Sequence, residues 1–271
     1  MLLISLAVKF YIVILILRSV MTRQELYFNP AGKFVAAATE PIFSTFFKKF
    51  SKAATDKLIP ATIFLVILIY IFANFLFTGN LISSLAGSVS DVLGFFMLFY
   101  IISVYLGSYA NSYSAGAYAT FFYRIGLFWV KLTRTFVRIS GNKIIIPTII
   151  VIFIAFLAIH TLFLGVLSIF TGSLDVVFLL KTSVKAGLLE FIGVIRVLTW
   201  LIIIRALMSW VSPDPRNPFV QIIITITDPF IEPLRKVIPP FGMIDISPII
   251  SLLLLEFIRI FLIRLIGLIF S

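Results

Sequence analysis

Charged side chains interrupt the last two apolar runs of the sequence, where most neighbouring residues are hydrocarbon. These charged residues are Glu190, Arg196, Glu256, Arg259 and Arg264. A charge at the centre of a membrane span costs about 2.5–3.5 kcal/mol on insertion scales, so such residues usually pair or serve a function. Three uses fit the pattern: ion pairs between helices, a polar path for an ion or a proton, and an anchor for a lipid head group.

The depths of these charges favour ion pairing. If the two runs cross the membrane in opposite directions, their residues can be matched at about 1.5 Å per residue. Arg205 and Glu256 then lie at similar depth, and Glu190 and Arg264 both lie near the outer face. We therefore expect ion pairs that lock the two helices together, with an ion path and a lipid site as the alternatives.

Catalytic chemistry has little support in this sequence. There are no cysteines, which excludes disulfides, iron–sulfur clusters and thiol catalysis, and we recognise no nucleophile–base pair or glycine-rich phosphate loop. His160 is the single histidine, so a zinc or bis-histidine haem site would lack its second histidine ligand. We predict that His160 hydrogen-bonds a neighbouring helix. The expectation is a non-enzyme with no catalytic, cofactor-binding or metal-binding residues.

A second group of polar residues starts at the end of the fifth apolar run and continues through the loop that follows. Its members are Arg205, Asn217, Thr227, Asp228, Arg235 and Asp245. The guanidinium of Arg205 can reach the last carbonyls of its own helix or an aspartate of the loop, namely Asp214, Asp228 or Asp245. We expect Arg205 to clamp the loop against the hairpin. The alternative is a docking surface for a cytoplasmic or membrane partner.

A damaged copy of this second group lies near the start of the chain. Arg18 corresponds to Arg205, and Thr39-Glu40-Pro41 corresponds to Thr227-Asp228-Pro229. The threonine follows the arginine by 21 residues in the first copy (18 to 39) and by 22 in the last (205 to 227). The repeat predicts two similar structural units, with Arg18 and Thr39 as the counterparts of Arg205 and Thr227.

Composition places these residues in a membrane protein. Hydrophobic residues make up 61% of the 271 residues and charged residues 12%, whereas a soluble domain carries about 25% charged residues. Runs of about 20 apolar residues can span a bilayer. Six such runs are present, at about 2–20, 58–78, 85–106, 144–170, 184–209 and 248–270.

The six runs group into three tandem two-helix hairpins. Pro60, Pro147 and Pro248 each open an even-numbered run, where proline suits the first helical turn. The predicted fold is all-α, with a first hairpin in 1–80, a degenerate middle hairpin in 81–172 and a third in 173–271. The middle hairpin lacks the arginine and the threonine–acid–proline signature.

Positive charge collects in the three long loops between paired spans. The net charge is +11, and the loops at about 21–57, 107–143 and 210–247 carry most of the lysines and arginines. The positive-inside rule places these loops in the cytoplasm and, with six spans, both termini outside. Anionic lipid head groups are the nearest partners for charge beside a membrane. We therefore expect contacts with the bilayer and with anionic lipids, and none with nucleic acid.

The long loops are themselves amphipathic. In the last loop a narrow polar stripe of Gln221, Thr225, Asp228, Glu232 and Arg235 crosses an apolar helix. Such a helix can lie in the membrane interface or tuck between the spans as a re-entrant segment. We favour the interface for the middle loop, because its polar face is uniformly basic, and leave both readings open for the last. Asp228-Pro229 is expected to end one helix and start another.

The last hairpin resembles the YggT family of bacterial membrane proteins, also called YlmG, with relatives in cyanobacteria and chloroplasts. The matching residues are Arg205, Ser209-Trp210, Pro213-Asp214-Pro215, Asn217-Pro218, Thr227-Asp228-Pro229, Pro233, Arg235, Ile238-Pro239-Pro240, Gly242, Asp245 and Ser247-Pro248. The first hairpin matches at Arg18, Asn29-Pro30, Thr39, Pro41 and Pro60, and the middle one departs almost completely.

The resemblance implies a multi-pass protein of the bacterial inner membrane. In different members it implies links to osmotic stress and potassium uptake, to cell division, or to assembly of cytochrome complexes in plastids. Two functional hypotheses follow. The first is a non-catalytic scaffold or assembly factor whose amphipathic cytoplasmic loops engage lipid and a membrane-protein partner or a second copy. The alternative is a transporter or channel for a small ion, potassium or proton.

Overall fold

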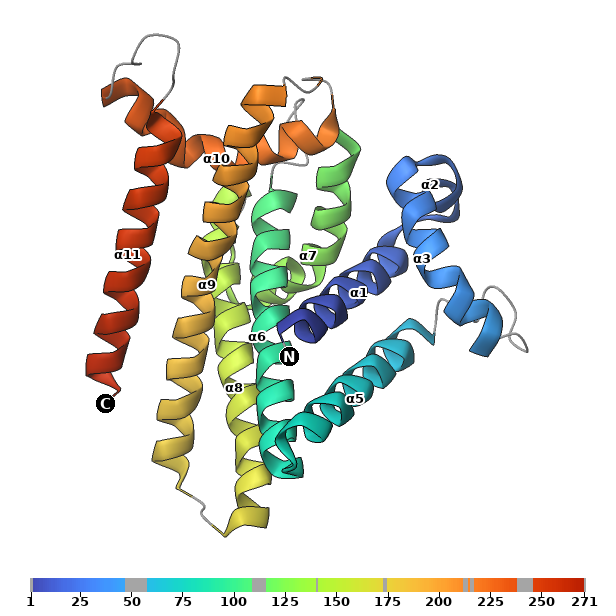
Figure 1. The fold of residues 1–271 in the computed structure, drawn as a ribbon, viewed down its shortest axis with the longest axis vertical. Helices are drawn as coiled ribbons and strands as arrows, with labels where there is room; N and C mark the ends of the chain where they lie inside the picture. The colour runs from blue at the N-terminus through green and yellow to red at the C-terminus, as the bar shows by residue number, and fades with distance from the viewer. Residues whose placement is uncertain are drawn as a thin grey trace. The chain divides into compact units, whose positions relative to one another are not determined.

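The computed structural model describes residues 2–46, 58–108, 116–139, 141–172, 175–211, 214, 217–237 and 246–270. Apart from short turns, these residues are helical, and none of them forms a strand. The first helices (Figure 1) are α1 Leu2–Val20, α2 Arg23–Phe28, α3 Pro30–Phe46, α5 Ile59–Thr78 and α6 Leu81–Gly107. They are followed by α7 Gly116–Phe136, η2 Gly141–Ile144, α8 Ile145–Thr171, α9 Val176–Val211, α10 Pro218–Val237 and α11 Ser247–Ile269.

Five of these helices, α1, α5, α6, α8 and α9, are long and apolar enough to cross a membrane. The sixth predicted span, α11, carries Glu256, Arg259 and Arg264 within its 23 residues and is not among the five. The protein is therefore an all-α membrane protein. Its arrangement as six spans in three hairpins remains a prediction.

The observed helix bounds follow the apolar runs closely, with one exception. Helix α9 has 36 residues and begins at Val176, whereas the apolar run begins at about 184. At about 1.5 Å per residue it is about 54 Å long, which exceeds the ~30 Å hydrocarbon core of a bilayer. Its ends therefore extend beyond the apolar core. The polar residues Lys181 and Lys185 do not interrupt the helix, since lysine is a good helix former.

The chain divides into two compact units. Unit 1 comprises Met1–Phe96 and Leu162–Leu174, and unit 2 comprises Met97–Thr161 and Asp175–Ser271. In unit 1, helix α1 packs against α3 and α5, and α2 packs against α3. The buried core between them consists of Leu15, Phe43 and Ile59, one residue from each of α1, α3 and α5.

Unit 2 contains the last hairpin, in which α9 and α11 pack along one another and both contact α10. Helix α10 lies across α9 and α11 (Figure 1). The buried core of this group is Ile202, Ile231 and Leu255, again one residue from each of the three helices. Like the core of unit 1, this core takes one residue from each of two long helices and one from the amphipathic helix between them in the sequence.

The rest of unit 2 contains close helix contacts made possible by glycine. A side chain at Gly107 at the end of α6 would meet the backbone of Tyr123 in α7, and one at Gly126 would meet Val104. On α8, His160 Nδ1 lies 2.9 Å from Ser183 Oγ on α9. The predicted hydrogen bond between His160 and a neighbouring helix is thus present.

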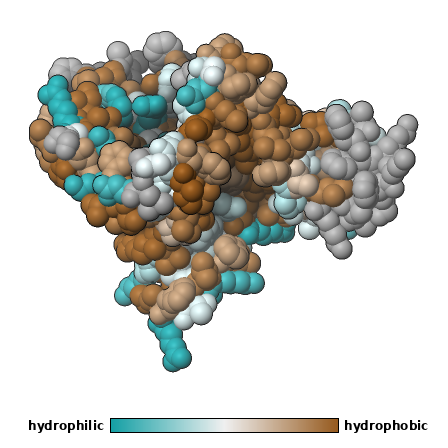
Figure 2. Space-filling model, turned by 90° about the horizontal axis from the view of Figure 1, so that it is seen from below, coloured by the Kyte–Doolittle hydropathy of each residue, from teal (hydrophilic) through white to brown (hydrophobic). Residues whose placement is uncertain are grey.

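Much of the surface of the candidate spans is not covered by the chain itself. Between 17% and 39% of each span is buried within the protein. Figure 2 shows one face of the molecule, on which hydrophobic side chains predominate. Exposed Phe64, Leu162 and Phe178 are examples of the large apolar residues involved. Lipid tails or other membrane proteins must cover this surface, because removing apolar surface from water lowers the free energy.

Candidate functional site

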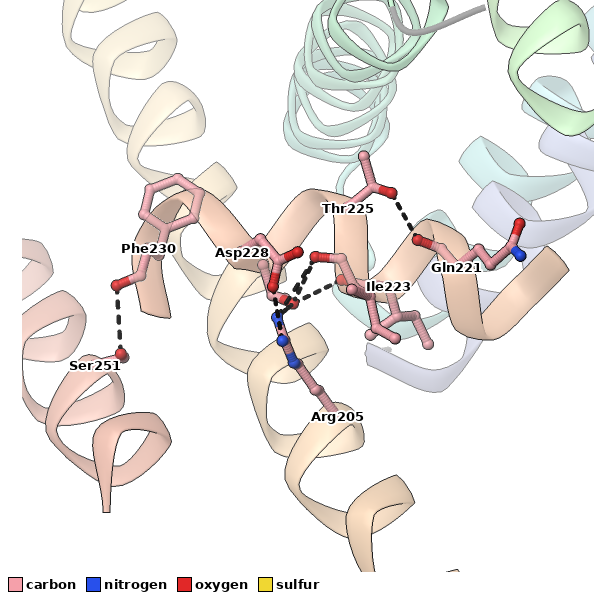
Figure 3. A network of polar contacts seen from close by, with 9 residues as sticks. Arg205, Gln221, Ile223, Thr225, Asp228, Phe230 and Ser251 are labelled. Atoms are coloured by element: carbon pink, nitrogen blue, oxygen red, sulfur yellow. Dashed lines mark hydrogen bonds and ion pairs between the residues drawn. The ribbon is translucent and has the colours of Figure 1, made fainter. Parts of the chain in front are cut away.

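The loop between α9 and α11 is held by Arg205, which lies near the end of α9. Its Nη2 forms an ion pair with Asp228 Oδ1 at 2.6 Å, and its Nη1 donates to Thr227 Oγ1 at 2.7 Å (Figure 3). The same Nη1 donates to the carbonyl of Ile224 at 3.4 Å. One guanidinium therefore contacts a carboxylate, a hydroxyl and a backbone carbonyl of α10. We call Arg205, Thr227 and Asp228 the second clamp.

Helix α10 presents these acceptors because its amphipathic sequence turns one face inward. Ile223, Ile226 and Ile231 are buried on that face, while Pro233 and Arg235 are exposed. Thr227 is fully buried, and its hydroxyl donates to the carbonyl of Ile223 at 2.6 Å while it accepts from Arg205. The hydrogen bond to Ile223 thus fixes the orientation of the hydroxyl that accepts from Arg205.

The prediction that one helix ends and another starts at Asp228-Pro229 is wrong. Helix α10 continues from Pro218 to Val237 with Pro229 and Pro233 inside it. Proline inside a helix removes a backbone donor and leaves a carbonyl one turn earlier without its usual partner. Pro229 leaves the carbonyl of Thr225 without that partner, and Arg205 donates to the neighbouring carbonyl of Ile224, while Ile231 packs in the core beyond the proline. Tertiary contacts therefore sustain a helix that the local sequence disfavours.

The first copy of the motif forms a similar arrangement in unit 1. Arg18 at the end of α1 donates to Thr39 Oγ1 and to Glu40 Oε2, the latter at 3.3 Å. Thr39 is fully buried and donates to the carbonyl of Val35 at 2.7 Å. The guanidinium also lies over the ring of Phe43, 4.5 Å from its centroid, where a cation–π interaction adds to the contact. Arg18, Thr39 and Glu40 are the first clamp.

The cores beside the two clamps use equivalent positions. Leu15 precedes Arg18 by three residues, as Ile202 precedes Arg205. Phe43 follows Thr39 by four residues, as Ile231 follows Thr227. Each clamp thus has a buried apolar contact about one helical turn away, between the same two helices that the clamp joins. The sequence repeat corresponds to a repeated packing unit.

Of the other residues of the predicted loop group, the structure describes Asn217 and Arg235. Asn217 precedes α10, and its backbone carbonyl accepts the amide of Gln221 at 3.1 Å. Arg235 is exposed in the last turn of α10. Asp245 lies outside the described residues, as do Pro213, Pro215, Pro239 and Pro240.

The charges of α9 and α11 are arranged differently from the expected pairs. Glu256 forms its ion pair with Arg259 one turn along α11, with Nε and Oε2 2.8 Å apart. Arg205, which was matched to Glu256 by depth, contacts Asp228 instead. Depth alone misled because the loop helix α10 places a carboxylate nearer to Arg205.

The remaining two charges differ in exposure. Glu190 is half-buried on α9, and Arg264 is exposed on α11. The structure shows no direct contact between these two among its described hydrogen bonds and ion pairs. Their predicted roles as intramembrane charges therefore remain predictions.

One polar cluster was missed by the sequence analysis. Asp91 of α6 accepts hydrogen bonds from Lys9 and Ser5 of α1 and from Tyr70 of α5. The expectation that intramembrane charge concentrates in the last hairpin was therefore incomplete. The signal was present, because Lys9 and Asp91 interrupt the apolar runs 2–20 and 85–106.

The middle loop forms α7, and its basic residues are exposed. Arg124, Lys131 and Arg134 face away from the packed side of the helix, where Phe121, Ile125 and Thr133 are buried, and Arg138 is exposed just beyond its end. Such a polar face beside an apolar one is typical of an interfacial helix.

Comparisons with known proteins place the last hairpin in a described group. The profile of the CCB3/YggT family matches residues 186–266, which include the second clamp, α10 and most of α9 and α11. The protein YggT of Escherichia coli K12, described as uncharacterised, is 41% identical over 75 residues, which are 27% of this chain and 39% of that protein. The chain thus spans about two fifths of the length of this relative.

Two further relatives are also described as uncharacterised. A protein of Pseudomonas aeruginosa is 38% identical over 64 residues, covering 24% of this chain and 32% of that protein. The protein ycf19 of Guillardia theta is 36% identical over 70 residues, covering 25% of this chain and 75% of that protein. No solved structure matches the chain.

Proposed function

This chain belongs to the YggT family, and from that premise we propose that it is a non-catalytic scaffold or assembly factor of the membrane that acts through clamped amphipathic helices. The observation that carries the proposal is the occurrence of the same clamp twice. In each copy an arginine at the end of a candidate span holds a proline-containing helix by a buried threonine and the carboxylate after it.

The clamps support a scaffold role because each leaves one face of its helix available. On α10 the residues after the clamp include exposed Phe230, Glu232 and Arg235. On α3 the exposed side chains include Lys33 and Phe34. A mixed aromatic and charged surface on a rigid helix is suited to a protein partner, since ordering costs are already met before binding.

We extend the proposal to topology. Helix α11 is the sixth span, because its 23 residues give a length of about 35 Å and it packs along α9. The basic helices then lie on the cytoplasmic side of a bacterial inner membrane, where anionic lipids are the nearest partners, and both termini lie outside. Because α10 is one continuous helix lying across its neighbours, the interfacial reading is favoured over the re-entrant one.

The test is photocrosslinking from α10 in living cells. A photoreactive residue in place of exposed Lys236 should capture a discrete membrane-protein partner or a second copy. Arg205→Gln and Asp228→Asn should each lower capture several-fold, because α10 is no longer held in place. Arg196→Gln is the matched control, since it changes an exposed arginine on the same helix that takes no part in the clamp.

Insertion and abundance are measured for every variant by membrane fractionation. Arg235→Ala should also lower capture, because it removes an exposed side chain from the surface of α10. Unchanged capture in Arg205→Gln and Asp228→Asn at normal abundance would contradict the proposal. Failure of all variants to insert would also count against it, because the clamp would then serve folding alone.

The second candidate function is a transporter or channel for potassium or protons, connected with osmotic adaptation. The observation that favours it is the Glu256–Arg259 ion pair on α11, which is partly exposed inside a predicted span, with Arg196 on the adjacent helix α9. On this reading Glu256→Gln and Arg196→Ala should change ion flux into proteoliposomes under potassium and proton gradients, with unchanged protein content. Equal flux in both variants and the unmodified protein would remove the support for this candidate.

A further inference from the structure

The polar cluster of unit 1 joins three helices at a single carboxylate. Asp91 Oδ1 accepts from Lys9 Nζ at 2.6 Å, while Asp91 Oδ2 accepts from Ser5 Oγ at 2.8 Å and from Tyr70 OH at 2.9 Å. These donors come from α1 and α5, and Asp91 comes from α6. Three candidate spans are therefore tied together by one ionised group.

The cluster lies well inside those spans. Lys9 is seven residues beyond Leu2, where α1 begins, and Asp91 is ten residues beyond Leu81, where α6 begins. At about 1.5 Å per residue these positions are about 10 and 15 Å from the helix ends. Charges at such depth are costly and mark functional positions by default.

A polar seam connects the cluster with the turn between α5 and α6. Asn74 of α5 donates to Ser88 of α6 at 2.9 Å, and the hydroxyls of Thr78 and Ser84 form a hydrogen bond one turn further on. Tyr70, Asn74 and Thr78 recur every four residues along one face of α5. Apolar packing would hold two adjacent helices equally well, so this row of hydrogen-bonding groups at membrane depth needs a further reason.

The chemistry of the cluster is suited to a proton. A metal cation needs a cage of several oxygen ligands, about 6–8 in the case of calcium. Here the groups around the carboxylate are an ammonium and two hydroxyls that all donate to it. The ammonium of Lys9 thus already occupies the place beside Asp91 that a metal cation would take. Adding a proton to Asp91, by contrast, requires no further ligand.

Two titratable groups hydrogen-bond Asp91 among the residues that the structure describes. They are Lys9 from α1 and Tyr70 from α5. Helix α5 contains no Asp, Glu, Lys, Arg or His. The next charge on α1 is Arg18, near the far end of that helix. The carboxylate and Lys9 are 30% and 25% exposed, so the pair is not sealed by the chain.

We propose that Asp91 is a proton-binding site, reached along the α5–α6 seam, whose occupancy decides whether the first half of α1, which carries Ser5 and Lys9, is held to α5 and α6. A proton added to the carboxylate forms the neutral acid and breaks the ion pair, while Lys9 keeps its own proton. The cluster changes from neutral to singly positive. Lys9 then extends towards the nearer end of α1, as long basic side chains do in membranes. This site goes beyond the scaffold role and does not depend on it.

The test measures proton binding and helix attachment separately in the full chain. The protein has no cysteines, so spin labels can be placed at Leu6→Cys on α1 and Ile82→Cys on α6, both exposed positions. In lipid vesicles at alkaline pH we expect one short distance between the labels. Acidification should add a longer distance, and infrared difference spectra should show a protonated carboxyl band.

Three variants distinguish the site from a static lock. Asp91→Asn should give the longer distance at both pH values and should lack the carboxyl band. Lys9→Gln should also give the longer distance at both pH values. The charge swap Lys9→Asp with Asp91→Lys should restore the short distance at alkaline pH, which shows that the chain has folded. Glu256→Gln is the control, because it removes another carboxylate inside a predicted span and should behave as the unmodified protein.

Two results would overturn the proposal. One is an inter-label distance in the unmodified protein that does not change with pH. The other is a carboxyl band that persists in Asp91→Asn. In either case the cluster is a permanent lock between α1, α5 and α6.

Discussion

Thr227 uses one hydroxyl for two hydrogen bonds. It donates to the carbonyl of Ile223 within α10 and accepts from Arg205 on α9. Thr39 does the same between Val35 and Arg18. A threonine in this position fixes the direction of its lone pairs, so the arginine meets an acceptor that needs no reorientation. This explains why the hydroxyl recurs in both copies although the following acid is Asp in one and Glu in the other.

Removing this hydroxyl should destabilise the last hairpin. Thr227→Val keeps the shape of the side chain but deprives Arg205 of an acceptor, and hydrogen bonds to charged groups contribute about 1.5–3 kcal/mol. We expect a decrease of that size in the free energy of unfolding, measured by titration with SDS in mixed micelles. Thr227→Ser should retain most of the stability.

The matched control for this change lies on the same helix. Thr225→Val removes a hydroxyl that bonds the carbonyl of Gln221 within α10. This substitution should change the free energy of unfolding much less, because the described contacts of that hydroxyl do not reach another helix. Equal losses for Thr225→Val and Thr227→Val would show that the arginine contact contributes little.

At the scale of elements, helix continuity and helix spacing depend on contacts from neighbours. Helices α3 and α10 continue through Pro41 and Pro229 beside their clamps. Helices α6 and α7 approach closely where Gly107 and Gly126 have no side chain. At Gly107 an added Cβ would lie 2.7 Å from Tyr123 Cα, and a backbone atom cannot move aside as a side chain can.

Gly107→Ala should therefore displace α7. The new methyl group has no room against the Tyr123 backbone, so the helices must separate. Overpacking of this kind costs about 1–3 kcal/mol, and we expect a lower thermal unfolding midpoint in detergent. Gly267→Ala on α11 is the control, because nothing lies within 4 Å of its added Cβ. It should leave the midpoint unchanged or raise it, since alanine favours helix by about 1 kcal/mol. A normal midpoint for Gly107→Ala would contradict the close contact.

At the scale of the whole molecule, charge decides how the chain lies in the membrane. The net charge is +11, and the basic residues gather in long loops between paired spans, while the short connections after α5 and α8 are nearly uncharged. Moving lysine and arginine across a membrane is unfavourable, and the proposed topology therefore keeps the basic loops on the side of synthesis. The proposed topology follows from this asymmetry.

Thiol labelling tests the topology directly. In the cysteine-free chain, Leu81→Cys at the start of α6 and Val176→Cys at the start of α9 are exposed positions. A membrane-impermeant maleimide should label both from outside intact spheroplasts. Lys131→Cys on α7 should be labelled after permeabilisation and not before. Labelling of Lys131→Cys in intact spheroplasts would show that the proposed orientation is wrong.

Sequence determined much of the helical scaffold and where the repeated motif begins and ends. Apolar runs gave the helix bounds to within a few residues at α1, α5 and α8, because a run long enough for the bilayer has to be helical to satisfy its backbone. The spacing from Arg205 to Thr227 indicated the clamp, and the contact with Asp228 was among the expected alternatives.

Tertiary structure decided the partners of the charges and the continuity of α10. The sequence left Glu256, Asp214, Asp228 and Asp245 open as partners of Arg205, and in the structure Arg205 pairs with Asp228 while Glu256 pairs with Arg259. It predicted a break at Pro229, yet α10 continues there, held by the clamp before the proline and by the packing of Ile231 after it. Lys9 and Asp91 lie 82 residues apart, and their contact exists because three helices meet there. Sequence fixes which groups are costly to leave unpaired, and the packing of helices decides which partner each one finds.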